Sequence, residues 1–188
     1  MNKHAFPVLI LTATAHLAAA AAVAEPAGIS AALRAPAGEQ PDFVLNARGV
    51  QIYACKPRAS DPYAYQWTFV APEATLLEGD KIVGRHGAGP FWESVSDHSS
   101  VKGAARERQD GGAGNIPWLL LAATASEGSG RFTGVTSIQR VATRGGVEPT
   151  TSCDAANSGQ EARVNYTADY YFYKHQPQPV SARPGSAY

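Results

Sequence analysis

The chain has 188 residues, of which 44% are hydrophobic, and its 16 lysines and arginines balance 16 aspartates and glutamates. This length suits one domain with a substantial hydrophobic core. The basic residues form no long block of charge, so the composition excludes the clustered Lys and Arg surface with which proteins bind nucleic acid.

The N-terminal 24 residues have the features of a cleavable secretory signal peptide. Lys3 and His4 form a short basic start, and an apolar or small-residue run follows over residues 8–22. Ala22-Val23-Ala24 supplies the small-x-small pattern of a signal peptidase site, so cleavage is expected after Ala24. The alternative is an uncleaved anchor, but a membrane span needs about 20 strongly apolar residues and this run is rich in alanine. We therefore predict a secreted or periplasmic protein with no transmembrane span in the mature chain.

The two ends of the mature chain lack the apolar residues of a folded core. Residues 25–40 are rich in Ala, Pro and Gly and are predicted to be flexible, with a short helical turn near Ile29 to Leu33. Residues 175–188 are rich in Pro, Gln and small residues and are predicted to form a disordered tail. The folded domain is therefore expected over residues 41–174.

Within that domain, short segments rich in β-branched and aromatic residues alternate with Gly- and Asp-containing breaks, which indicates strands. The stretch 116–125 has the Leu and Ala content of a helix, but Ile116-Pro117 starts it in an extended conformation, so we predict a strand. The predicted strands are 42–46, 51–55, 65–70, 74–77, 81–85, 91–93, 101–106, 118–123, 134–142 and 163–173.

Two turns and the last strand indicate the fold class. Glu78-Gly79-Asp80 lies between two apolar runs and predicts a hairpin, and Gly49 predicts a second one. In the last strand a period of two places one set of side chains on a single face: Val164, Tyr166, Ala168, Tyr170 and Phe172. This pattern suits an antiparallel sheet with one buried face. The sequence thus predicts an all-β single domain, an antiparallel β-sandwich or a barrel-like sheet, with little helix.

Cys55 and Cys153 are the two cysteines of the chain. In an exported protein, a disulfide between them is the natural interpretation. Two buried free thiols or one reactive thiol are the alternatives, and the spacing provides neither a C-x-x-C redox pair nor a zinc knuckle.

The segment from Gly84 to Glu93 contains the strongest candidate for a ligand site. Its glycines and proline allow tight backbone paths that bring His86, Trp92 and Glu93 near one another. A histidine changes charge near neutral pH, and a nearby carboxylate could orient its ring. The alternative is a glycine-rich loop with a packed Trp and a hydrogen-bonded His.

Three functions follow from these observations. The first is a binding or envelope-associated protein that contacts an unknown ligand or envelope component through residues 86–93. The second is a small hydrolase or lyase in which His86 is the general base, Glu93 or Asp97 orients it, and Arg140 clamps an anion. The third is a structural or interaction protein without a small ligand. His86, Trp92, Glu93 and Arg140 are therefore the candidate ligand-binding residues.

The sequence predicts no metal and no cofactor. His86, Glu93, Asp97 and His98 include the side chains that bind zinc, but their spacing matches no ligand pattern. The glycines of 84–89 and 111–114 lack the G-x-G-x-x-G order of a dinucleotide site. The tyrosines near residue 170 could stack on a sugar, but packing in the core or on the sheet is expected instead.

Several short motifs together resemble one protein family. They are Gln51-Ile-Tyr-Ala-Cys55, Trp67-Thr-Phe69, His86-Gly-Ala-Gly-Pro-Phe-Trp92, Ile116-Pro-Trp-Leu-Leu-Leu121, Gly134-Val-Thr-Ser-Ile-Gln-Arg140, Gly145-Gly-Val147, Cys153-Asp-Ala155 and Ala168-Asp-Tyr-Tyr-Phe-Tyr173. Over about residues 41–173 the chain is similar to Domain of Unknown Function 3455, a family of secreted bacterial and fungal proteins. The resemblance implies secretion and no mechanism. The chain departs from the pattern of this family at His98, where a glycine is typical.

Overall fold

The computed structural model describes residues 22–176 of the chain. The predicted signal peptide falls outside the described residues except for Ala22, Val23 and Ala24, and so does the predicted tail from residue 177 onward. Signal and tail therefore stay predictions.

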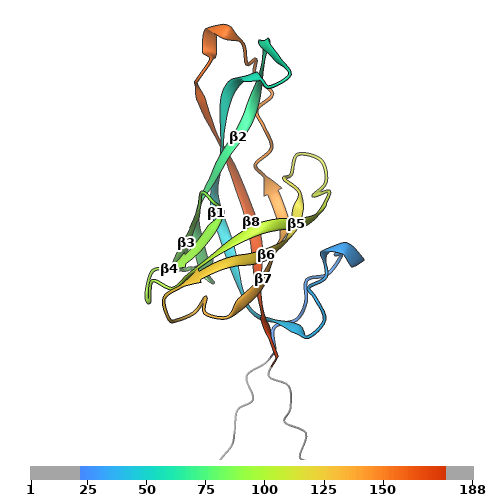
Figure 1. The fold of residues 1–188 in the computed structure, drawn as a ribbon, viewed down its shortest axis with the longest axis vertical. Helices are drawn as coiled ribbons and strands as arrows, with labels where there is room; N and C mark the ends of the chain where they lie inside the picture. Colours follow the sequence, from blue (N-terminus) through green and yellow to red (C-terminus); the bar gives the residue numbers. More distant parts are fainter. Residues whose placement is uncertain (1–21, 177–188) are drawn as a thin grey trace, which may run out of the picture.

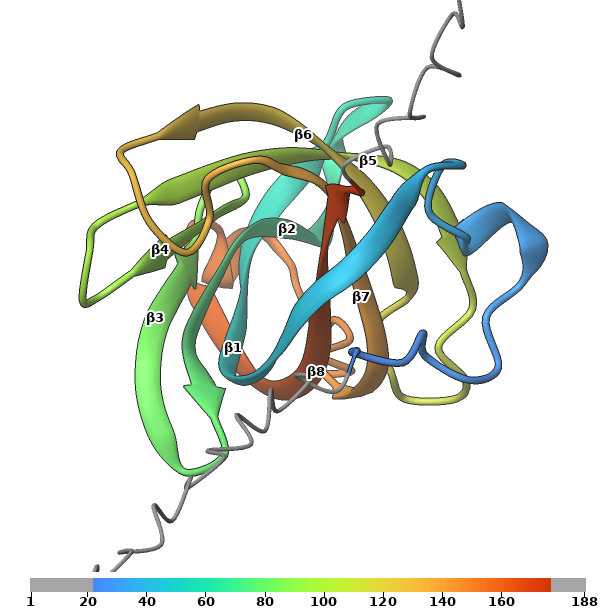
Figure 2. The same cartoon turned by 90° about the horizontal axis from the view of Figure 1, so that it is seen from below.

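The described chain folds into one closed antiparallel barrel (Figures 1 and 2). Each strand pairs with the next one in the chain, and β1 also pairs with β8, which closes the ring. The all-β prediction is confirmed, in its barrel-like form. The strands are β1 (Glu39–Arg58), β2 (Asp61–Glu78), β3 (Lys81–Gly87), β4 (Phe91–Ser94), β5 (Ser100–Gln109), β6 (Trp118–Glu127), β7 (Val135–Gly145) and β8 (Glu161–His175), with short 3-10 turns η1 (Ala31–Leu33) and η2 (Ala155–Asn157).

The hairpin predicted at Glu78-Gly79-Asp80 is present between β2 and β3, with Gly79 at a φ of 59°. The hairpin predicted at Gly49 is wrong, because Gly49 lies within β1 and is paired with both β2 and β8. A Cβ atom at this position would run into the carbonyl oxygen of Glu73 and into Ala74. The sequence carries glycine here because the backbone of β2 approaches closely, so two predicted strands are one continuous strand.

Aromatic side chains fill much of the barrel interior. The period-two face of β8 is confirmed, since Tyr166, Ala168, Tyr170 and Phe172 are all buried. Phe172 stacks on Phe43, and the Phe132 ring packs edge-on against both. These rings form a solid core that supports the rest of the interior.

Residues 25–40, predicted to be flexible, contain η1 and the start of β1. Leu33 is fully buried, and its carbonyl accepts a hydrogen bond from the Gln139 side chain. The Gln139 amide oxygen in turn accepts a hydrogen bond from the hydroxyl of Tyr173. Tyr173 is thus fully buried, although its side chain is on the opposite face of β8 from that of Tyr170.

An arm projects beyond the barrel at the top of Figure 1. We define the arm as residues 53–70 of the β1–β2 hairpin with residues 146–160 between β7 and β8. The predicted disulfide between Cys55 and Cys153 is present and joins these two parts, with their Cα atoms 5.5 Å apart. The Trp67 indole N–H adds a hydrogen bond to the carbonyl of Thr151 at 2.9 Å. The arm is therefore cross-linked both covalently and by hydrogen bonds.

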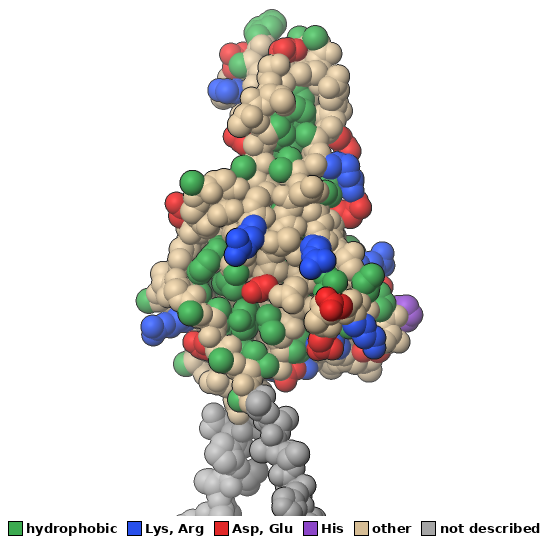
Figure 3. Space-filling model, turned by 180° about the vertical axis from the view of Figure 1, so that it is seen from behind, with side chains coloured by type: hydrophobic (Ala, Val, Ile, Leu, Met, Phe, Trp, Pro, Cys, Tyr) green, Lys and Arg blue, Asp and Glu red, His purple; other side chains and the backbone are tan. Residues whose placement is uncertain are grey.

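Within residues 22–176, no helix has the length and apolar character needed to cross a membrane. On the face seen in Figure 3, basic and acidic side chains are interspersed, with hydrophobic side chains between them.

Candidate functional site

A cavity of about 330 Å³ opens into the barrel near the base of the arm. Four of its lining residues have polar side-chain atoms: His86 of β3, Trp92 of β4, Arg140 of β7 and Tyr170 of β8. The rest of its wall is mainly apolar: Phe69, Val70, Pro72, Pro90, Leu119 and Leu121, with Gly89 and Ala105. Phe69 is 50% exposed and Val70 is 44% exposed, so they lie where the cavity meets solvent. The structure thus brings together three of the four predicted site residues: His86, Trp92 and Arg140.

The His86 ring is held in one tautomer. Its Nδ1 lies 2.7 Å from the carbonyl oxygen of Phe91, which can only accept, so Nδ1 carries the proton and donates. His86 is only 4% exposed, and burial lowers its pKa to about 4, against the raising effect of the Phe91 hydrogen bond. The positive charge of Arg140 lowers the pKa of His86 further. At neutral pH the ring is therefore uncharged, and Nε2 is left as a hydrogen-bond acceptor.

Trp92 and Tyr170 enclose the His86 ring. The centroid of the His86 ring lies 4.6 Å from that of Trp92 and 5.0 Å from that of Tyr170. The indole N–H of Trp92 is buried and makes no hydrogen bond within the described chain, and the buried hydroxyl of Tyr170 makes none of normal geometry there. Burial raises the pKa of the Tyr170 hydroxyl, which stays protonated, although weak hydrogen bonding with the nearby Tyr166 and Arg140 lowers this pKa in part. Unpaired polar groups in such a buried place cost free energy, which a bound molecule that hydrogen-bonds to them would offset.

Arg140 lies on the interior face of β7, two residues after the core residue Ile138. Strand pairing places it between Leu119 of β6 and Tyr170 of β8. Its Nε and Nη2 atoms donate to the carbonyl oxygen of Pro117 at 3.1 and 2.8 Å. The guanidinium also lines a second, adjoining cavity of about 270 Å³, together with Gln51 and Tyr53 among others. Arg140 is thus the cation shared by two neighbouring hollows.

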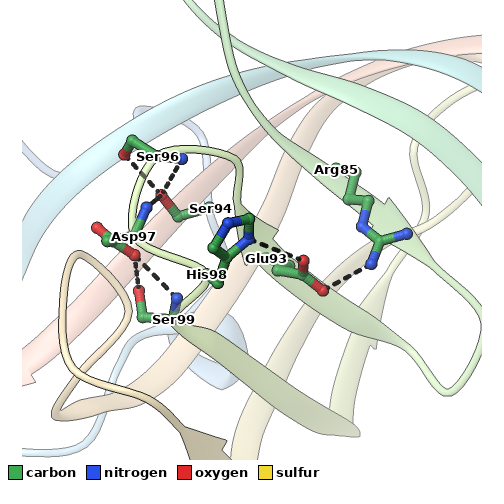
Figure 4. Close-up of polar contacts among 7 residues, drawn as sticks. All are labelled: Arg85, Glu93, Ser94, Ser96, Asp97, His98 and Ser99. Atoms are coloured by element: carbon green, nitrogen blue, oxygen red, sulfur yellow. Dashed lines mark hydrogen bonds and ion pairs between the residues drawn. The ribbon is translucent and has the colours of Figure 1, made fainter.

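Glu93, the fourth predicted site residue, lies outside the cavity. It follows Trp92 in β4 and so points to the opposite face of the strand. Figure 4 shows it on that face between Arg85 and His98. Its carboxylate accepts a hydrogen bond from Arg85 Nη2 at 2.8 Å and lies 3.9 Å from Nδ1 of His98. The group that orients His86 is therefore the backbone carbonyl of Phe91, and the predicted His86–Glu93 pairing is wrong.

The turn after β4 uses its polar groups to hold its own backbone (Figure 4). Asp97 accepts hydrogen bonds from the Ser99 backbone N–H and hydroxyl and from the Arg131 N–H, at 2.9, 2.6 and 3.1 Å. These bonds lower the pKa of Asp97 to about 2, and the two from Ser99 have the largest effect. Among residues 22–176, no group of three or more His, Cys, Asp or Glu side chains is placed to hold a metal ion.

The sequence motifs did not indicate Tyr170 or the two leucines of β6, Leu119 and Leu121, as parts of the site. The period-two pattern did place Tyr170 on the buried face of β8, and a hydroxyl on such a face is a usable signal. Leu119 and Leu121 gave no signal, because an apolar residue lining a cavity has the same sequence pattern as one in the core.

Comparison with known families agrees with the resemblance seen in the sequence. A family model described as a protein of unknown function, DUF3455, matches residues 36–80 and 77–174. The chain belongs to the DUF3455 family. The matched residues run from just before β1 into β8, so this family covers nearly the whole barrel and all four cavity side chains named above. No curated protein and no solved structure matches the chain.

Proposed function

We propose that this DUF3455 member is an exported binding protein that holds a small molecule inside its barrel. The cavity lined by His86, Trp92, Arg140 and Tyr170 is the observation that supports this function. A mostly apolar hollow with a few convergent polar groups is the usual form of a small-molecule site.

The shape of the site favours a small ligand over a large envelope component. About 330 Å³ is at the lower end of the volumes that hold small organic molecules, and four strands supply its polar groups. A polymer or a protein surface would instead need an extended exposed face.

The same site supports catalysis by His86 less well. Neither carboxylate expected to orient the ring does so, because Glu93 lies on the opposite face of β4 and Asp97 holds the turn after β4. A ring with a pKa of about 4 is also a weak base at neutral pH. The cavity wall contains no Ser, Thr, Cys, Asp or Glu that could serve as a nucleophile or a second acid. We therefore propose binding and not hydrolysis as its function.

Export is part of this proposal. The Cys55–Cys153 disulfide is the kind of cross-link that persists in oxidising compartments, and the predicted signal peptide would deliver the chain there. If export is correct, protein purified from its host has the intact mass of a chain that begins at Glu25. A mass that includes residues 1–24 would contradict cleavage.

Two fluorescent dyes test binding. Phenylnaphthylamine is neutral, and anilinonaphthalene sulfonate has the same rings plus one negative charge. At least one should bind the folded protein, and Ala105→Trp should weaken that binding about tenfold, because an indole would fill the cavity mouth.

Ala104→Trp is the matched control for this experiment. Ala105 is exposed, lines the cavity and pairs with Leu121, whereas Ala104 neighbours it on the other face of β5. Binding should therefore be unchanged by Ala104→Trp. If neither dye binds, or if both variants behave alike, the proposed cavity is not the binding site.

A further inference from the structure

We infer that the ligand of this cavity is a small organic anion, with one acidic group held by Arg140 and an apolar body against the wall formed by Leu119 and Leu121. This inference rests on the proposed binding function and adds the chemical class of the ligand.

The first argument is the charge of the cavity. Arg140 supplies a positive charge, and none of the residues lining the cavity is acidic. Within the described chain, Arg140 forms no ion pair, in contrast to Arg85, Arg131 and Arg163. Glu148 influences the pKa of nearby Tyr53 but makes no ion pair with Arg140. A guanidinium in a largely apolar hollow without a carboxylate partner favours a ligand that brings the negative charge.

The second argument is the hydrogen-bonding capacity of the guanidinium. It has five N–H donors, and two of them are used by the Pro117 carbonyl. That double contact fixes the plane of the group and leaves further donors for a ligand. A planar donor group with a fixed orientation matches the two oxygens of a carboxylate or the oxygens of a sulfonate.

The third argument is the set of polar groups around Arg140. The Tyr170 hydroxyl, 1% exposed, lies close enough to Arg140 that the guanidinium lowers its pKa, although burial raises it more. This hydroxyl and the Trp92 N–H are buried without a hydrogen-bond partner of normal geometry, so the surroundings of the cavity hold polar hydrogens and no carboxylate. His86 is uncharged at neutral pH, so it neither competes with Arg140 for the anion nor neutralises it.

The adjoining cavity extends the positive region. Arg108 lines it beside Arg140, is exposed, and forms no ion pair within the described residues. Gln51 also lines this cavity, and its side chain lies close to the Tyr166 hydroxyl, whose pKa is raised by burial and lowered in part by hydrogen bonding between the two. Two cations, Arg108 and Arg140, therefore line this adjoining cavity, and no acidic residue does.

The test compares the two dyes on Arg140→Gln, which removes the charge and keeps a polar side chain. Anilinonaphthalene sulfonate should bind about tenfold more weakly or worse, because a charge-assisted hydrogen bond contributes about 1.5 to 3 kcal/mol. Phenylnaphthylamine binding should change less than about twofold, since it has no charge to lose. Arg144→Gln is the matched control, because Arg144 is on the same strand and lines a different hollow.

A second measurement does not depend on the variant folding. Benzoate should displace anilinonaphthalene sulfonate from the wild-type protein, and benzamide, which has nearly the same shape without the charge, should not. Equal displacement by both compounds would overturn the anion assignment.

The outcomes separate this inference from the proposed function. If both dyes bind in an Ala105-dependent way and Arg140→Gln weakens them equally or not at all, the cavity binds small molecules but is not selective for anions. If neither dye binds, the proposed function fails and the inference fails with it. Selective loss of the sulfonate dye supports both.

Discussion

The imidazole of His86 stacks on the indole of Trp92, with ring centroids 4.6 Å apart and an angle of 11° between the planes. The two residues are direct cross-strand partners in β3 and β4, so the antiparallel register itself makes this contact. Tyr170 packs against both rings. A titratable side chain is thereby fixed in an aromatic enclosure in the cavity wall, and its protonation is coupled to folding.

The free energy of unfolding should fall in mild acid because of His86. The pKa of this residue is about 4 in the folded protein, below its ordinary value of 6.5. Above about pH 6.5 the ring is neutral in both states, whereas below it the unfolded chain takes up a proton that the folded protein excludes. Stability is therefore lost as the pH falls from about 6.5 towards 4, by about 2 to 3 kcal/mol between pH 7.5 and pH 4.5.

Urea unfolding of the wild type and of His86→Asn at these two pH values measures this contribution. Asparagine keeps a donor for the Phe91 carbonyl and does not titrate. The difference in unfolding free energy between the two pH values should therefore be smaller in His86→Asn by about the same 2 to 3 kcal/mol. His98→Gln, which replaces an exposed histidine, serves as the control. Identical pH dependence in the wild type and His86→Asn would show that His86 is not the group responsible.

Replacing His98 by glycine should stabilise the protein. His98 has a φ of 57°, in the left-handed region that is unfavourable for side chains with a Cβ atom. Glycine removes this strain, with an expected gain of about 1 kcal/mol, partly offset by the greater freedom of the unfolded chain. The departure from glycine noted in the sequence thus has a structural cost.

Thermal unfolding of His98→Gly and His98→Ala separates backbone from side-chain effects. Alanine removes the imidazole and its 3.9 Å contact with Glu93 but keeps the strained backbone. We expect the glycine variant alone to be more stable than the wild type. Equal melting temperatures for the two variants would mean that the backbone conformation carries no cost.

Removing the disulfide should destabilise the protein by about 4 to 5 kcal/mol, since the cross-link closes a loop of about 100 residues. Cys55 and Cys153 are 98 positions apart. A Cys55→Ala, Cys153→Ala double variant tests this, with alanine chosen because Cys55 is fully buried. Reductant should lower the urea midpoint of the wild type and leave that of the variant unchanged. A loss below about 1 kcal/mol would show that the hydrogen bonds of the arm suffice without the disulfide.

Local patterns predicted much of the fold. The alternation in β8, the Glu78–Asp80 turn and the strand predicted after Ile116-Pro117 rest on short-range signals, and the structure confirms each of them. Gly49 shows where such signals fail. A glycine required by a close backbone approach has the same local signature as a glycine in a turn, and the chain that approaches it is 24 or more residues away in sequence.

The candidate site shows the same division. The unusual residue content of 84–93 and the arginine at 140 could be recognised in the sequence. Their association could not, because the β3–β4, β6–β7 and β7–β8 pairings together form the wall of the cavity. The glycines and proline of 84–93 predict a loop that gathers His86, Trp92 and Glu93, but Trp92 and Glu93 are in β4, where alternation sends neighbouring side chains to opposite faces.

By itself the sequence determined the fold class, the family and the residues able to do chemistry, since hydrophobic period, turn residues and motifs are properties of short segments. The tertiary structure decided which of those residues share a space. Closure of β1 onto β8 surrounds His86, Trp92, Arg140 and Tyr170 with apolar side chains and leaves Glu93 in solvent reach. Burial then keeps the histidine neutral at neutral pH, and the residues gathered around the arginine in the cavity include no carboxylate. Both effects depend on long-range contacts.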